Sequence, residues 1–289
     1  MTLPRPSPQP LDDASVLEVL SLGDLEVVGR IVDASNATLY ATATHESVGL
    51  PCVYKPVGGE RPLWDFPART LARREVAAYL VAVTAGWPVV PPTVLRDGPF
   101  GPGSVQAWVG PAVQADGSVT VHAGLTDPGA GLIDIVPVGA VPDGWLRVLD
   151  AEGYDGRPVS LVHADHADLR RMALLDVVVN NADRKGGHVL RDAFGRVFGV
   201  DHGLTFNLED KLRTVLWGWA GERFSDESRA CLAALAAALR PAGSLRRALS
   251  DLLSAAEAEL TAERVQTLIE RDRFPRPRAG RPHIPWPAF

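Results

Sequence analysis

The hydrophobic pattern of this chain changes its period along the sequence, and that change limits the folds that are open to it. Between residues 25 and 113, short segments alternate apolar and polar residues in the way that is typical of β-strands. These segments are LEVVGRIV, ATLYATAT, LPCVYKP, VVPPTVLRD and SVQAWVGPAV. The first three are expected to pair antiparallel. A helix is predicted before the fourth, over TLARREVAAYLVAVTAG, with Gly86 as its C-cap.

From His163 onward the period becomes helical. A helix is predicted over HADHADLRRMALLDVVVNNAD, followed by two short strand-like pieces, RKGGHVL and GRVFGVDHG. Further helices are predicted over SDESRACLAALAAALR with Ser225 as N-cap, over GSLRRALSDLLSAAEAEL, and over TAERVQTLIERDR with Thr261 as N-cap. Strands first and helices later predict an α+β fold of two lobes with a cleft between them.

Composition divides the chain into four expected regions: a disordered, proline-rich N-terminal arm at 1–13, an N-lobe of β-sheet with one helix at 14–110, a mainly helical C-lobe at 111–270 and a Pro/Arg-rich tail at 271–289. Both ends are expected to be peripheral, because clustered prolines disfavour regular structure. The segment LTDPGAGLIDIVPVGAVPDG is rich in Gly and Pro and is interpreted as a connector between the lobes.

Charge and cysteine content exclude several classes of protein. A net charge of −6 argues against a nucleic-acid binder, which needs clustered Lys and Arg. Cys52 and Cys231 are the two cysteines and lie far apart, so neither a disulfide framework nor a Cys zinc site is indicated. No apolar stretch approaches the ~20 residues of a transmembrane helix. A cytoplasmic location is therefore expected.

A strand lysine and a helical glutamate are the first candidates for chemistry. Lys55 ends the third predicted strand, and Glu75 lies in the next helix, where it can pair with the ammonium group. Phosphoryl transfer needs such a cation at the nucleotide phosphates. A solvated surface pair is the alternative interpretation.

Two later motifs add carboxylates. The turn NNADRKGGHVL gathers Asp183, Arg184, Lys185 and His188 directly after a strongly apolar run, where loops often hold active sites. Alternatively, Asp183 merely bonds the turn at a helix end. In FGVDHG, Asp201 follows an apolar strand and precedes a glycine turn, which can present a carboxylate to a metal ion or simply initiate that turn.

The segments VYKPVGGERP, RREVAAYLV, NADRKGGHVL, VDHGLTF and LRTVLWGW occur in this order. Together they resemble the phosphatidylinositol 3-/4-kinase superfamily, and most closely the type II phosphatidylinositol 4-kinases with their plant and bacterial relatives, including uncharacterised actinobacterial proteins. The similarity covers about residues 25–220. It implies a two-lobed kinase-like fold and a phosphotransferase that depends on ATP and on Mg²⁺ or Mn²⁺.

The resemblance also implies roles for these residues. Lys55 would contact the α/β phosphates and Glu75 would fix Lys55. Asp201 would bind the metal, and Asp183 would orient or deprotonate the acceptor hydroxyl. Lys185 replaces a histidine of the family's catalytic loop, which puts a second cation either near the γ-phosphate or in solvent.

The nucleotide itself would contact two further segments. Ser35 and Asn36 lie in a turn without the usual glycine-rich loop, although its amides and hydroxyls could still cradle phosphate. Adenine would contact the backbone near Gln106, Trp108 and Val109.

His188 is a departure from the family pattern, because it replaces a metal-binding asparagine. Imidazole suits transition metals, so a ligand role predicts that Mn²⁺ supports binding better than Mg²⁺. With an unperturbed pKa of about 6.5, it also predicts that metal-dependent ATP binding weakens as the pH falls toward about 5.5.

The acceptor is expected to be a protein side chain or a small hydroxylated molecule. A phosphoinositide headgroup ranks behind these, because neither Cys52 nor Cys231 lies in a cysteine-rich, lipid-modified insertion like that of the type II lipid kinases. Two alternatives use the same residues: a pseudokinase or nucleotide-binding module, and a nucleotidyltransferase that modifies protein.

Overall fold

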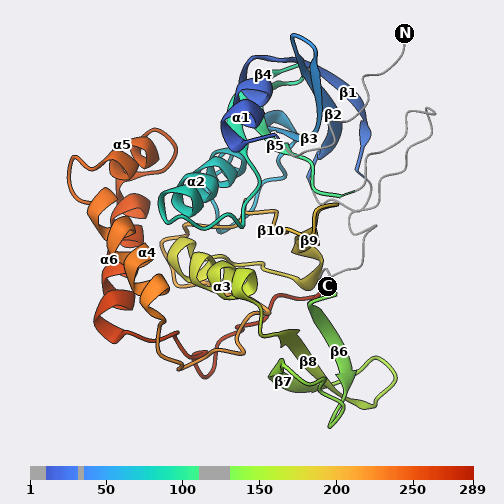
Figure 1. The fold of residues 1–289 in the computed structure, drawn as a ribbon, viewed down its shortest axis with the longest axis vertical. Coiled ribbons are helices and arrows are strands. Elements are labelled where there is room, and N and C mark those ends of the chain that lie inside the picture. The colour runs from blue at the N-terminus through green and yellow to red at the C-terminus, as the bar shows by residue number, and fades with distance from the viewer. Residues whose placement is uncertain (1–10, 32–35, 111–130) are drawn as a thin grey trace.

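A computed structural model describes residues 11–31, 36–110 and 131–289. Its first part is a five-stranded sheet in the order β1-β2-β3-β5-β4, and every neighbouring pair is antiparallel (Figure 1). The strands are β1 (Asp24–Arg30), β2 (Leu39–His45), β3 (Val48–Pro56), β4 (Thr93–Gly98) and β5 (Gly101–Ala107). The five strands predicted for this part of the sequence are therefore confirmed.

A helix that the sequence analysis did not anticipate precedes the sheet. It is α1 (Asp13–Leu22), and the side chain of Asp12 caps it by accepting the Ser15 amide. Its buried Val19 and Leu20 pack on sheet residues such as Tyr54. The expectation of one helix in this region was therefore wrong, because the short helix has too few turns to show a clear period. The rest of the predicted arm, residues 1–10, lies outside the described residues.

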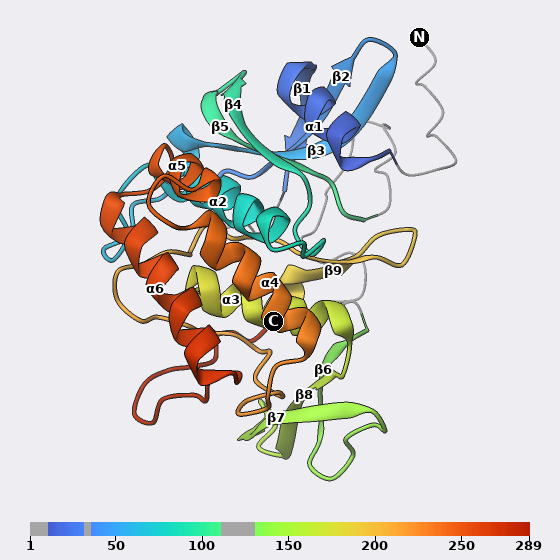
Figure 2. The same cartoon turned by 60° about the vertical axis from the view of Figure 1, so that its left-hand side comes forward.

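The second helix, α2 (Leu71–Thr84), lies between the sheet and the later helices (Figure 2). It ends before Gly86, which has a left-handed φ of 71°. Its Arg74 is 1% exposed, ion-pairs with Glu257 and donates to the Thr205 carbonyl at 2.5 Å. These contacts fix α2 to distant segments of the chain.

The later helices are α3 (Ala167–Val179), α4 (Asp226–Ala238), α5 (Ser244–Ser250) and α6 (Ala255–Arg271). Ser225 caps α4 as predicted. Thr261 is not an N-cap: it lies inside α6, and its hydroxyl donates to the Glu257 carbonyl at 2.8 Å. The helix begins earlier because Ser254 and Glu257 form a reciprocal capping box. Within the described ranges, none of the helices has the length and apolar content to span a bilayer.

Strands also occur in the second half of the chain. A three-stranded antiparallel sheet, ordered β6-β8-β7, consists of β6 (Ile133–Pro137), β7 (Trp145–Glu152) and β8 (Pro158–Ala164). Part of it lies in the segment interpreted as a connector, where left-handed turns at Gly139 and Gly144 conceal the alternation. A hairpin of β9 (Val189–Arg191) and β10 (Val197–Gly199) follows α3. The predicted α+β class is confirmed.

The tail after α6 forms no helix or strand in the described residues, as its prolines predicted. It is not peripheral, however. Phe274 is buried in the main core, and Ile284 and Phe289 pack against that core. The Ala288 carbonyl accepts the Gly186 amide at 2.7 Å, so the tail reaches the turn after α3. Its aromatic and aliphatic side chains account for this burial.

Candidate active site

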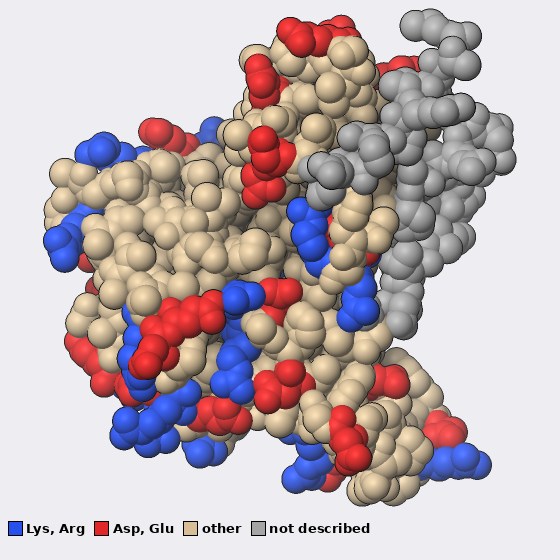
Figure 3. All heavy atoms as spheres, in the orientation of Figure 1, with Lys and Arg blue, Asp and Glu red and all other residues tan. Residues whose placement is uncertain are grey.

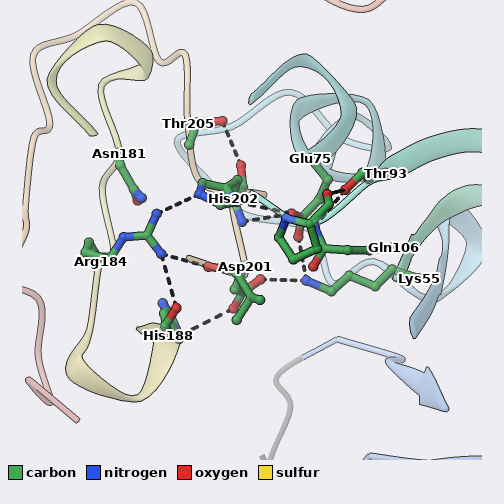
Figure 4. Close-up of polar contacts among 12 residues, drawn as sticks. Lys55, Glu75, Thr93, Gln106, Asn181, Arg184, His188, Asp201, His202 and Thr205 are labelled. Atoms are coloured by element: carbon green, nitrogen blue, oxygen red, sulfur yellow. Dashed lines mark hydrogen bonds and ion pairs between the residues drawn. The ribbon is translucent and has the colours of Figure 1, made fainter. Parts of the chain in front are cut away.

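Lys55 joins three segments that are far apart in the sequence (Figure 4). From the end of β3, its ammonium group lies 2.5 Å from Glu75 Oε1 on α2 and 2.9 Å from Asp201 Oδ1 after β10. Glu75 is buried, and its second oxygen accepts the His202 amide at 2.8 Å. The structure thus brings together three of the residues that the sequence singled out.

These contacts set the charges of the cluster. Burial alone would lower the pKa of Lys55, but Asp201 and Glu75 outweigh it and raise that pKa. Lys55 in turn holds the pKa of Asp201 well below its usual range. Burial raises the pKa of Glu75, and the nearby Asp201 charge adds to this effect. One ammonium between two carboxylates leaves negative charge that a further cation could compensate.

Asp201 has an unusual backbone. Its φ is 59°, a left-handed value that few residues other than glycine adopt. Such conformations cluster at functional sites, where the surrounding structure maintains them. Here the backbone amide of the next residue, His202, donates a hydrogen bond to the Glu75 carboxylate. The Asp201 side chain is 52% exposed, so its carboxylate remains accessible to a ligand.

The turn after α3 positions Asp183. Asn180 ends the helix with a left-handed φ of 52°, and the side chain of Asn181 accepts the Asp183 amide at 3.0 Å. Burial raises the pKa of Asp183 to about 6, although Lys185, whose ammonium lies 3.3 Å away, opposes this shift. Asp183 can therefore exchange a proton near neutral pH. The Lys185 ammonium group thus pairs with the Asp183 carboxylate, and its side chain is largely shielded from solvent.

Arg184 holds the two loops together and was not among the predicted site residues. It is fully buried and pairs with Asp176 of α3 at 3.0 Å. It also donates to the Val200 carbonyl at 2.9 Å and contacts His202 Nε2 at 2.6 Å, on either side of Asp201. Thr214 donates to Asp176 at 3.0 Å. The sequence did contain a signal for this pair: Asp176 is a charged residue within the apolar helix, and Arg184 follows shortly after that helix.

His188 lies beside Asp201, with 3.6 Å between its Nε2 and Asp201 Oδ2. Burial lowers the pKa of His188 to about 4, although Asp201 opposes this shift. The imidazole is therefore neutral at pH 5.5. If His188 binds the metal, metal-dependent ATP binding should weaken near pH 4 and not near pH 5.5. Nδ1 of His188 is buried and has no hydrogen-bond partner among the described residues.

The donor set around Asp201 can be compared with what a metal needs. No group of three His, Cys, Asp or Glu side chains in the described part of the chain could hold an ion. Mg²⁺, however, usually takes one or two carboxylates, with waters and substrate phosphates completing its shell. Asp201 could therefore supply one carboxylate ligand to an ion that is also bound by nucleotide phosphates, and His188 could add a nitrogen ligand.

The predicted phosphate turn is described in part. Ser35 lies outside the described residues. Asn36 is described, and its side-chain oxygen accepts the Arg61 amide at 2.8 Å. This contact gives Asn36 a structural role, since it holds the chain that follows β3.

The predicted adenine segment lies at the end of β5. The side chain of Gln106 is buried and donates to Thr93 at 2.8 Å, and the Trp108 amide donates to the Pro51 carbonyl at 3.0 Å. Val109 follows and is 7% exposed. Gln106 and Trp108 are thus engaged within the sheet.

Comparison with known proteins identifies a close relative. No protein-family model matches the chain. The chain is 50% identical over 274 residues to Protein Rv2133c of Mycobacterium tuberculosis (strain ATCC 25618 / H37Rv), and the alignment covers 94% of each protein.

Proposed function

The chain belongs to the family of Protein Rv2133c, and we propose that it is an ATP-dependent phosphotransferase with a two-lobed, kinase-like fold related to the phosphatidylinositol 3-/4-kinases. The observation that carries this proposal is the contact of Lys55 with both Glu75 and Asp201. Kinases use such a strand lysine, fixed by a helical glutamate, beside a metal-binding aspartate. In this chain Lys55 lies on β3, Glu75 on α2 and Asp201 after β10, which supports the proposal.

The reaction follows from the charges at the site. Lys55 would bind the α/β phosphates of ATP while Glu75 keeps the ammonium in place. Asp183, with its pKa raised to about 6, would accept the proton of the acceptor hydroxyl. The acceptor oxygen then bonds to the γ-phosphorus as the bond to the ADP oxygen breaks. A divalent ion on Asp201 would neutralise phosphate charge.

We place a protein side chain or a small hydroxylated molecule ahead of a lipid headgroup as acceptor. Lipid attachment at Cys52 is not possible in the folded chain, because that thiol is fully buried in the sheet and burial raises its pKa to about 12.

A nucleotide-binding module without turnover is the second candidate. It is favoured by His188, which lies beside Asp201 at the position where the resembling kinases have a metal-binding asparagine. The described residues also contain no group of three His, Cys, Asp or Glu side chains that could hold a metal ion, which points the same way.

Calorimetric titration with ATP and Mg²⁺ tests the nucleotide site. Lys55→Met should weaken binding by about tenfold or more, because a charge-assisted contact to phosphate is lost. Lys211→Met is the matched control, since Lys211 pairs with Asp65 at 2.7 Å in a separate ion pair. If both variants bind ATP as tightly as the wild type, Lys55 is not a nucleotide ligand.

Turnover separates the two candidates. Asp183→Ala should retain ATP binding and lose ATP consumption, because it removes the proton acceptor and leaves Lys55 in place. Wild-type protein that binds ATP without consuming it over hours would favour the binding module. Mass spectrometry of self-modified protein distinguishes a phosphoryl from an adenylyl adduct.

A further inference from the structure

A pocket of about 920 Å³ lies between α6, residues 208–217 and the chain that follows α6. Neither Lys55 nor Asp183 nor Asp201 lines it. Protein sites for small molecules typically measure about 300–1,000 Å³, so the pocket is large enough for one. Trp217 and Phe274 contribute to its apolar walls.

Arginine dominates the charge of this pocket. Six arginines line it, against the two carboxylates of Asp210 and Glu263, and no lysine does. The six are Arg264, Arg271, Arg273, Arg276, Arg278 and Arg281. Figure 3 shows basic side chains gathered at the lower left, where α6 ends in Figure 1. This local excess contrasts with the net charge of −6 of the whole chain.

Few of these arginines are neutralised by the protein. Arg278 pairs with Asp210 at 2.9 Å, and Arg273 donates to the Gly221 carbonyl at 3.0 Å. Arg271 and Arg276 form no ion pair with a carboxylate in the described residues, and both are exposed. The rim of the pocket therefore has guanidinium groups that are free to bind an anion.

Arg264 supplies a more deeply placed charge. Its guanidinium donates to the carbonyls of Val178 at 3.2 Å and Asn207 at 3.0 Å. These carbonyls orient the group but carry no net charge. Burial lowers the pKa of Arg264 to about 10, so the side chain stays charged at neutral pH. A partly buried cation without a carboxylate contact is stabilised when a ligand brings the counter-charge.

We propose that this pocket binds a small molecule that carries two or more phosphate groups, with Arg264 at its floor and Arg271 and Arg276 at its rim. Guanidinium is planar and matches phosphate oxygens with paired hydrogen bonds, which a lysine cannot do. The apolar walls beside Trp217 would hold the rest of the ligand. The pocket is half open and gathers its arginines around one hollow, which suits a compact ligand better than the backbone of a nucleic acid, which needs an extended basic track.

Titration of inorganic tripolyphosphate into the full chain in the presence of EDTA tests this proposal without the metal that the first site requires. Arg271→Gln combined with Arg276→Gln removes rim charge without breaking an ion pair of the described structure. The matched control is Arg157→Gln combined with Arg240→Gln, two exposed arginines outside the pocket.

Tripolyphosphate should bind the wild type saturably, and the rim variant should bind about tenfold more weakly or worse. The control variant should bind like the wild type. The proposal fails if the wild type shows no saturable binding, if the rim variant binds equally well, or if both variants weaken to the same extent. Tighter binding of a single-stranded oligonucleotide than of tripolyphosphate would overturn the choice of ligand.

Discussion

Replacement of Asp176 by asparagine tests the buried network that supports the candidate catalytic turn. Asp176 Oδ1 accepts Asn181 Nδ2 at 2.9 Å and Arg184 Nη2 at 3.0 Å, and its Oδ2 accepts Thr214 at 3.0 Å. Asparagine keeps the shape but removes the charge and turns one accepting oxygen into a donor. Arg184, which is 0% exposed, then has no counter-charge.

The size of the effect follows from that burial. Removing one partner of a buried ion pair costs about 3–5 kcal/mol of unfolding free energy. Asp168→Asn makes the same chemical change on the same helix, where Asp168 pairs with Arg171 at 2.7 Å and is 23% exposed. That change should cost about 1 kcal/mol or less. We therefore expect a difference of about 2 kcal/mol or more between the two variants.

Urea unfolding, followed by circular dichroism and tryptophan fluorescence, measures both free energies. A double variant, Asp176→Leu with Arg184→Met, removes both charges of the buried pair. It should be more stable than Asp176→Asn, because no buried charge is left without a partner. If Asp176→Asn costs no more than Asp168→Asn, the network does not stabilise the fold as its burial implies.

Three further predictions concern single residues. The kcat/KM for ATP turnover should fall below about pH 6, because protonated Asp183 cannot accept a proton; a flat profile from pH 7 to 5 would exclude it as the base. Because the pKa of His188 is lowered to about 4, the affinity for ATP and Mg²⁺, measured by calorimetry, should change by the same factor between pH 7 and 5.5 in wild type and in His188→Asn. A larger change in the wild type would show that the imidazole becomes charged in this range. Ser254→Ala should lower the urea-derived free energy of unfolding by about 1 kcal/mol through loss of the α6 cap, whereas an unchanged value would show that the capping box is dispensable.

Local patterns were enough to predict much of the fold. The strands of the first sheet alternate clearly, and Ser225 marks the start of α4 because a hydroxyl before an apolar run is itself the capping signal. Ser254 gives an equally good signal, with Glu257 three residues later, yet the longer apolar pattern before Thr261 masked it. The strands β6 to β8 were missed because turns rich in Gly and Pro interrupt a weak alternation.

The site depends on tertiary contacts that spacing cannot reveal. Lys55, Glu75 and Asp201 could be singled out from the sequence, but their distances could not. Arg184 is important because it contacts both Asp176 and the chain around Asp201. These two segments come together only in the folded protein. The low pKa of His188 likewise results from burial, and a sequence does not encode burial directly at a turn.

The ion pair between Arg74 and Glu257 limits how this site could be switched on and off. Arg74 directly precedes Glu75 on α2, so any rotation of that helix that withdrew Glu75 from Lys55 would also pull Arg74 away from α6. Breaking such a buried pair costs about 3–5 kcal/mol, or a factor of about a hundred to several thousand in population. A regulator that worked by displacing α2 would have to favour the displaced form by at least that factor. The loops that hold Asp183 and Asp201 carry a similar constraint, because the buried pair of Arg184 with Asp176 holds them together.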